Sequence, residues 1–355
     1  MKKKSIYKLF VFISIVLLSS SCETIIDFEG ETKAPLLVVN SILQPDSIIN
    51  VHVTKSKFFL SSNQNYPVVR NATIKVIVND TAQETLTHIG EGYYKSNMRV
   101  KENDKVEISV EAPGMDLVKS VATVQPKITI LSIDTVWKKI EGDESYSYYN
   151  HELYSDSSYE VIGKSEIGKL TIKVKFKDDS AIKNFYQLNC SFLETTKYED
   201  IYGEIHEKEQ EYYSYYNVNY DDIIFGNTAN EQSDILDIES STVNNYFSDE
   251  LINGKEYTLS FSVLVAKTTF IPGKEPRNYS PDKYKILVSL DQLSRDYYLY
   301  QKTVIASVNS TPLFSEPIQI HNNIDGGIGI FGSTSRSIYK VQLNNLTPNY
   351  YNYGY

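Results

Sequence analysis

Three glycines near the end of the chain have the spacing of a nucleotide-binding turn. Gly327, Gly329 and Gly332 match the pattern GxGxxG. That chemistry requires a strand before the turn, a helix after it whose N-terminal amides hold the phosphates, and an acid about 20 residues further on. A Ser/Thr-rich stretch follows these glycines and the sequence stops at Tyr355, which leaves no room for the unit. We therefore predict a turn and a strand whose glycines permit close packing.

Histidine, aspartate and cysteine form no recognisable catalytic or metal-binding pattern. Asp178–Asp179 and Asp221–Asp222 lack the repeated acidic loop that encloses calcium, and acids are common in turns. Cys190 lies among alternating residues, so we interpret it as a small strand residue rather than a nucleophile. We predict no catalytic residue, no metal and no cofactor. Five histidines lack the spacing of zinc ligands or of a serine triad, and we interpret them as solvated or packed: His52, His88, His151, His206 and His321.

Tyrosine is the residue type whose placement suggests binding. The chain has 29 Tyr but one Trp, and tyrosines crowd two polar segments. Tyrosine rings on loops provide rigid, amphipathic contact area at low entropic cost, which suits recognition of a glycan or a peptide. The alternative is that the rings pack these segments onto a sheet or lie in disordered loops. The candidate ligand-binding residues are Tyr148, Tyr149, Tyr212, Tyr213, Tyr215 and Tyr216.

Four short motifs resemble the Asp-Ser/Thr-aliphatic sites that Bacteroidetes bacteria O-glycosylate on exported proteins. The candidate residues are Ser47, Thr81, Thr135 and Ser180. All four lie near predicted turns or strand ends. O-glycosylation at these positions is therefore a hypothesis.

The first 22 residues have the three parts of a secretory signal: a basic start, an apolar run over residues 9–18, and small residues before Cys22. The apolar run is about half of the roughly 20 residues that a membrane-spanning helix needs. The ending resembles the lipobox of bacterial lipoproteins, in which the cysteine is acylated and the chain is cut before it. Here Ser19 stands where the common lipobox has leucine. We predict a signal peptide over residues 1–21 and lipidation of Cys22, followed by a linker to residue 34; the alternative is an ordinary signal peptide with an incidental cysteine.

The charge of the chain excludes some partners. Loss of four lysines with residues 1–21 would change the formal charge from −10 to −14. An acidic body is repelled by nucleic acid and by anionic lipid, so contact with a bilayer must come through the acyl groups on Cys22. Acids after Cys22 suggest surface export, but leave the periplasmic and cell-surface sides of the outer membrane both open.

Strand patterns dominate the rest of the chain, so we predict a mainly β protein. Residues 35–126 contain short alternating strands separated by turn residues, which is typical of an immunoglobulin-like β-sandwich. Residues 127–355 form a larger β-rich domain in which polar, Tyr-rich inserts near 138–166 and 195–245 interrupt the strands. Apolar residues at helical spacing predict one helix near residues 291–306, with Asp291 or Ser294 as its cap.

Several stretches carry a resemblance to known families. Residues 72–76 and 92–94 resemble a pattern of immunoglobulin-like and carboxypeptidase-regulatory-like modules. The chain after the signal resembles the Bacteroidetes lipoprotein family catalogued as domain of unknown function 4249. That resemblance implies an outer-membrane location and association with TonB-dependent receptors, and it supplies no catalytic residues. The matching stretches are residues 35–39, 247–257, 293–298, 317–318, 322–324 and 326–332.

These observations lead us to expect a non-enzymatic accessory lipoprotein that binds a glycan or peptide or docks on an outer-membrane receptor. One alternative is a structural or assembly lipoprotein whose inserts fill an interface. Another is a glycan-active enzyme that uses two carboxylates far apart in the chain, which a cleft holding both would favour.

Overall fold

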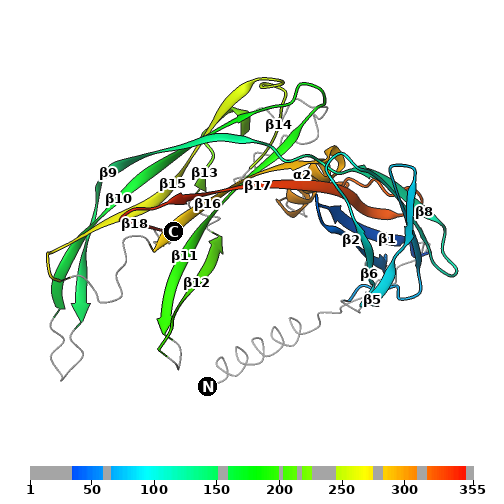
Figure 1. Cartoon of the computed structure of the whole chain (residues 1–355), viewed down its shortest axis with the longest axis horizontal. Coiled ribbons are helices and arrows are strands. Elements are labelled where there is room, and N and C mark those ends of the chain that lie inside the picture. Colours follow the sequence, from blue (N-terminus) through cyan, green and yellow to red (C-terminus); the bar gives the residue numbers. More distant parts are fainter. Residues whose placement is uncertain are drawn as a thin grey trace, which may run out of the picture.

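The computed structural model describes residues 34–58, 65–150, 159–199, 203–213, 218–225, 245–274, 283–309 and 318–348. These residues form three β-sheets with one α-helix and one short 3-10 helix among them, which confirms the predicted mainly β class (Figure 1). No helix in the described ranges is long and apolar enough to cross a bilayer.

The first region is a two-layer β-sandwich. Along most of its strands, buried side chains alternate with more exposed ones: between residues 73 and 78, for example, Ile74, Val76 and Val78 are buried. The buried side chains of both layers form one apolar core. One layer contains β1 (Leu37–Leu43), β2 (Ile48–Lys55), β6 (Tyr93–Arg99) and β5 (Thr87–Gly90), and the other contains β4 (Ala82–Thr85), β3 (Thr73–Val78), β7 (Lys105–Glu111) and β8 (Val118–Thr123).

The second region also has two layers around its own core, in which aromatic rings predominate near Phe176 and Phe247. One layer contains β9 (Ile130–Asn150), β10 (Tyr159–Lys177), β15 (Glu256–Phe270), β13 (Val218–Asn219) and β18 (Leu346–Pro348). The other contains β11 (Phe185–Glu199), β12 (Ile205–Tyr213), β14 (Tyr246–Ser248), β16 (Tyr284–Leu293) and β17 (Ile328–Gln342), while η1 (Ile223–Phe225) packs its apolar side chains into the core.

Strand β17 belongs to both regions. Its first residues pair in parallel with β1, from Val38 opposite Ile328 to Leu43 opposite Ser333. Its later residues pair antiparallel with β16. Phe331 of β17 is completely buried in the core of the first sandwich. A single nine-stranded sheet therefore runs through the molecule, as Figure 1 shows in the long central strand.

The glycine-rich stretch is explained by close packing, as predicted. Gly329 has φ +128°, and a Cβ atom there would lie 2.1 Å from the carbonyl oxygen of Val39 on β1. A Cβ atom on Gly332 would lie 2.7 Å from the Cβ of Tyr297. Strand rather than helix follows these glycines, so the stretch is a turn and a strand.

The predicted helix is confirmed as α2 (Arg295–Asn309). Ser294 is its N-cap, because the backbone N–H of Tyr297 donates to Ser294 Oγ at 3.4 Å. Asp291, the other capping candidate, lies within β16 instead. The buried ring of Tyr298 packs against Phe185 of β11, with 4.7 Å between ring centroids, and this contact holds the helix to the sheet.

The segments expected to be polar inserts are, where the structure describes them, mostly strand. Residues 138–150 continue β9, residues 159–166 begin β10, and residues 205–213 form β12. In β12 the side chains from Glu207 to Gln210 are all exposed. A strand that is exposed to solvent on both faces lacks the alternation of apolar and polar residues by which strands are recognised. The charged sequence of β12 therefore resembles that of a loop.

Candidate functional site

The outer face of the nine-stranded sheet carries polar side chains where β11, β16 and β17 lie side by side. Alternation along β11 sends Leu188 and Cys190 into the core and leaves Asn189 on the opposite face. The registers place Asn189 opposite Ser289 of β16, and Ser289 opposite Ile338 of β17. Three strands thus contribute side chains to one place on the sheet.

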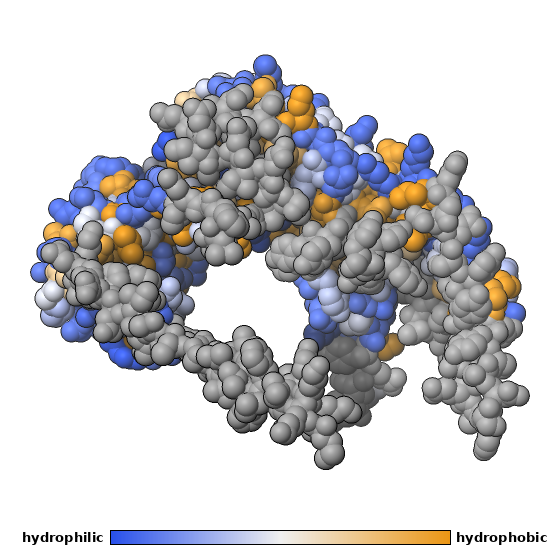
Figure 2. Space-filling model, turned by 180° about the vertical axis from the view of Figure 1, so that it is seen from behind, coloured by the Kyte–Doolittle hydropathy of each residue, from blue (hydrophilic) through white to orange (hydrophobic). Residues whose placement is uncertain are grey.

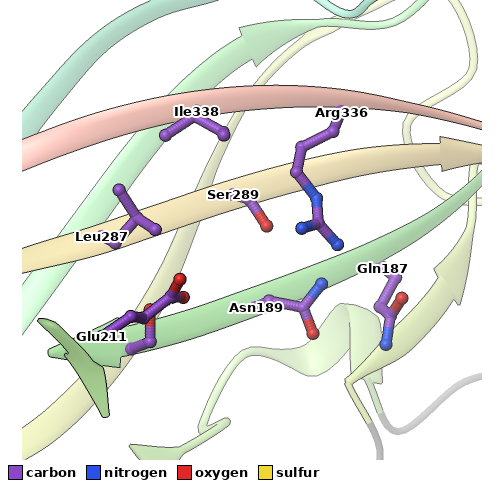
Figure 3. Close-up of a pocket in the computed structure, with 8 residues that line it drawn as sticks. Gln187, Asn189, Glu211, Leu287, Ser289, Arg336 and Ile338 are labelled. Carbon is purple, nitrogen blue, oxygen red and sulfur yellow. The ribbon is translucent and has the colours of Figure 1, made fainter. Parts of the chain in front are cut away.

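A shallow pocket of about 120 Å³ lies on this face. Figure 3 shows Arg336 reaching across β16 toward Asn189, with Leu287 and Ile338 beside them and Glu211 at the other end. We call this site the polar pocket. Its lining residues are Gln187, Asn189, Ser191, Glu211, Leu287, Ser289, Arg336 and Ile338.

Arg336, which lines the polar pocket, forms an ion pair with the buried Asp291. The Nε and Nη2 atoms of Arg336 donate to Asp291 Oδ2 at 3.0 and 2.9 Å. The Asp291 side chain is 2% exposed and that of Arg336 is 54% exposed. Burial raises the pKa of Asp291, and the hydrogen bonds and charge of Arg336 oppose that rise. The two charges neutralise each other, and the carboxylate of Asp291 already accepts hydrogen bonds from Arg336. We therefore interpret Asp291 as the residue that positions the guanidinium.

Further hydrogen bonds hold the polar side chains of the pocket in place. Gln187 Nε2 donates to the hydroxyl of Tyr246 at 2.8 Å. Asn189 Oδ1 accepts from Asn245 Nδ2 at 3.2 Å. Ser191 Oγ donates to Glu211 Oε1 at 2.6 Å. These contacts fix the amide and carboxylate groups before any ligand arrives.

Strand β12, which supplies Glu211, is tied to the sheet by a second charge cluster. Lys285 Nζ on β16 and Lys340 Nζ on β17 lie 2.9 and 2.8 Å from the carboxylate of Glu209. Hydrogen bonds from Lys340 and Lys285 lower the pKa of Glu209. The cluster spans β11 and keeps β12 beside the pocket.

The candidate tyrosines fall on two different sheets. Tyr148 and Tyr149 lie at the end of β9, where they pair with Val161 and Glu160 of β10. Tyr213 lies at the end of β12 and pairs with Ser191 of β11. Tyr215, Tyr216 and the lipidation candidate Cys22 lie outside the described residues.

Tyr212 is held against the sheet. Tyr212 lies opposite Phe192 of the neighbouring strand β11 and is half-buried. Burial raises its pKa, and the charge of Glu194 and a hydrogen bond to it add to that rise. Lys283 pairs with the same carboxylate, and its Nζ lies 5.4 Å from the ring centroid of Tyr284. The surroundings of Tyr212 fit the alternative that the tyrosine rings pack these segments onto a sheet, because Tyr212 helps to hold β12 against its neighbours.

The four candidate glycosylation residues occupy different surroundings. Thr81 and Ser180 are exposed in turns, and Ser47 is half-buried in the turn after β1. Thr135 is exposed within β9 (Ile130–Asn150), opposite Ile172 of β10. The aspartates before Ser47 and Thr81 have φ values of 59° and 58°. Since aspartate tolerates this left-handed conformation, turn geometry also explains these two motifs.

The paired aspartates serve the fold. Asp178 Oδ1 accepts from the hydroxyl of Tyr186 at 2.5 Å and its Oδ2 accepts from the N–H of Gly254 at 2.7 Å. Asp222 accepts from the hydroxyl of Tyr257 at 2.5 Å. Across the described ranges, no group of three or more His, Cys, Asp or Glu residues is arranged to hold a metal ion.

Cysteine and histidine also have structural surroundings. Cys190 is buried in β11, as predicted, and burial raises the pKa of its thiol to about 12. His52 on β2 stacks on Tyr93 with 4.1 Å between ring centroids. His321 Nε2 lies 2.8 Å from Asp296 Oδ1, which joins the segment before β17 to α2.

Comparisons with known proteins identify a family for most of the chain. A model of the family described as "Domain of unknown function (DUF4249)" matches residues 23–340. No curated protein matches the chain. One solved structure, titled "Structural basis for the promiscuous specificity of the carbohydrate-binding modules from the beta-sandwich super family", aligns with 69% of this chain and 95% of its own at 8% identity. Its TM-score of 0.18 is too low to support any argument about fold or ligand. The family match covers most of the sequence, and the chain belongs to the DUF4249 family.

Proposed function

We propose that this protein is a non-enzymatic lipoprotein of the bacterial outer membrane that docks on a TonB-dependent receptor. The observation that carries the docking proposal is a pair of β-hairpins, β9–β10 and β11–β12, that extend on the same side of the molecule (Figure 1). Tyr148 and Tyr149 lie near the tip of one hairpin, whereas Tyr213 lies at the base of the other, where β12 ends beside Ser191 of β11.

The anchoring proposal is supported by the composition of the first 22 residues. A basic start, a short apolar run and three serines lead to Cys22. One acyl chain binds a bilayer only marginally, at about 0.8 kcal/mol per buried methylene, whereas several chains on one residue hold a protein stably. On the face shown in Figure 2, the coloured residues are mainly hydrophilic with separate apolar patches, which fits a body held beside a bilayer by its lipid.

The docking proposal is supported by where the hairpins lie in their sheets. Among the described strands, β9 and β12 are each the last in their sheet, so each has one backbone edge without a neighbouring strand. An edge of this kind can pair with a strand of another protein. Tyrosine beside such an edge adds contact area at low entropic cost.

Replacement of Cys22 by serine is expected to release the protein from the membrane fraction and to abolish metabolic labelling with palmitate, because serine is not acylated. The measurement is fractionation of the native bacterium with immunoblotting of the tagged chain. Cys190→Ser is the matched control, since its thiol is buried, and it should keep both label and location. Retention of Cys22→Ser in the membrane fraction would contradict the proposed anchor.

Affinity purification from the native envelope in gentle detergent is expected to recover one outer-membrane receptor reproducibly. Replacing Tyr148, Tyr149, Tyr215 and Tyr216 by serine should lower recovery at least tenfold, since loss of one central interface residue costs about 2 kcal/mol or more. Tyr339→Ser, at a 46% exposed tyrosine of β17, is the control and should leave recovery unchanged. Recovery of the protein alone would reject the docking proposal.

A further inference from the structure

We propose that the polar pocket binds a neutral polyhydroxylated ligand, such as one monosaccharide unit of a glycan. This goes beyond receptor docking, because the site lies on a sheet face and its binding test requires neither lipid nor receptor. The pocket combines a neutralised cation, several hydrogen-bonding groups and two apolar side chains.

The charge of the pocket disfavours an ionic ligand. Asp291 already neutralises Arg336, with both donating nitrogens of the guanidinium within 3.0 Å of Asp291 Oδ2. The other charged residue of the lining is Glu211, which forms no ion pair with Arg336. Its negative charge repels carboxylates and phosphates. A single exposed carboxylate is also a weak site for a cation, because water screens it.

The hydrogen-bonding groups suit hydroxyls. A hydroxyl both donates and accepts, whereas the lining contains amides, hydroxyls, a carboxylate and a guanidinium. A carboxylate has about four acceptor sites and an amide oxygen has two, so Glu211 and Asn189 keep acceptor capacity for a sugar hydroxyl beyond the bonds they already make. The internal hydrogen bonds of Gln187 and Asn189 hold these groups in position and reduce the entropy lost on binding.

The remaining side chains suit the C–H face of a sugar ring. Leu287 and Ile338 lie on adjacent strands beside the polar groups, and Ile338 is 54% exposed (Figure 3). The space of about 120 Å³ is below the roughly 300–1,000 Å³ of sites for drug-sized ligands, so it fits one ring rather than an enclosed chain. Binding through so few contacts should be weak, with a Kd of about 1 mM.

The test is saturation-transfer NMR on the full chain in detergent. The probes are the methyl glycosides of glucose, galactose and mannose, with sodium acetate and methylammonium chloride as charged comparisons. We expect at least one glycoside to receive saturation, most strongly at its ring C–H protons, and the two ions to receive none.

Two variants connect the signal to the pocket. Glu211→Gln and Ile338→Ser should each weaken binding of the same glycoside at least fivefold. Both residues are exposed, so the thermal midpoint should stay close to that of the unmodified chain. Glu207→Gln on the same strand, and Val136→Ser at a residue 55% exposed, are matched controls that should bind normally.

Three results would each overturn the proposal. The first is no saturation of any glycoside at concentrations up to about 50 mM, far above the expected Kd. The second is unchanged binding by both pocket variants. The third is saturation of acetate or methylammonium in place of the glycosides. None of these results depends on recovery of a receptor, so failure here is distinguishable from failure of the docking proposal.

Discussion

Residues 35–126, produced without the rest of the chain, are expected to remain unfolded or to aggregate. The fragment lacks β17, so six residues of β1 lose their parallel partner. It also lacks Phe331 and Ile324, which are buried in the core of the first sandwich. Loss of one buried Phe costs about 3–5 kcal/mol. That cost is a large part of the 5–15 kcal/mol by which a typical domain is stable, so the remaining contacts should not hold the fold.

The measurement is far-UV circular dichroism with thermal unfolding. The matched control is the same fragment carrying residues 318–334 on a flexible linker, which restores the β1 partner and both core side chains. That segment also restores the bond from Ser120 Oγ to the carbonyl oxygen of Asn323 at 2.7 Å. The control should unfold cooperatively, whereas cooperative unfolding of residues 35–126 alone would show that β17 is dispensable.

Arg336→Met is expected to destabilise the protein by about 2–3 kcal/mol at pH 7. Removing one partner of a buried pair typically costs about 3–5 kcal/mol, and the 54% exposure of Arg336 reduces that figure because water screens its charge. Asp291, at 2% exposure, would then hold an uncompensated charge. The measurement is chemical denaturation at several pH values.

The pH dependence of the stability of Arg336→Met shows whether the charge of Asp291 causes the loss. Burial already raises the pKa of Asp291 above its ordinary value of 3.8, and loss of Arg336 raises it further. An acid whose pKa is raised by folding stabilises the protein at low pH, and this stability is lost as the pH rises through the raised pKa. The deficit of Arg336→Met should therefore shrink below about 1 kcal/mol near pH 4.5. The double variant Arg336→Met with Asp291→Asn leaves no charge at this buried position. Its free energy of unfolding should lie within about 1 kcal/mol of that of the unmodified chain at pH 7. An equal loss of stability in the single and the double variant would mean that packing is responsible.

The elements that could be predicted from sequence are those with one solvent-exposed face and one buried face. Strands such as Lys105–Glu111 bury every second side chain, and this alternation is visible locally. The helix was visible through its apolar spacing, and Cys190 through the alternation around it. The glycine-rich stretch was interpreted correctly because a nucleotide-binding turn needs a helix after it, whereas the Ser/Thr-rich stretch that follows these glycines is strand.

Contacts between distant segments could not be predicted in this way. Nothing local to Val39 shows that Gly329 lies beside it, since pairing depends on the register of strands far apart in the chain. The polar pocket was missed for the same reason. Asn189, Ser289 and Ile338 are ordinary outward-facing residues on three separate strands, and only the two registers bring them together.

The parallel pairing of β1 with β17 also has a kinetic consequence. Val38 and Ile328 are about 290 residues apart, so this contact closes a very long loop. Contacts of such high sequence separation slow folding, because loop-closure entropy is lost before the contact forms. The amino-terminal region therefore cannot mature in the order in which it is synthesised. The edge of β1 stays uncovered until residues 328–333 have been synthesised, and during that interval the region depends on whatever protects nascent chains from association.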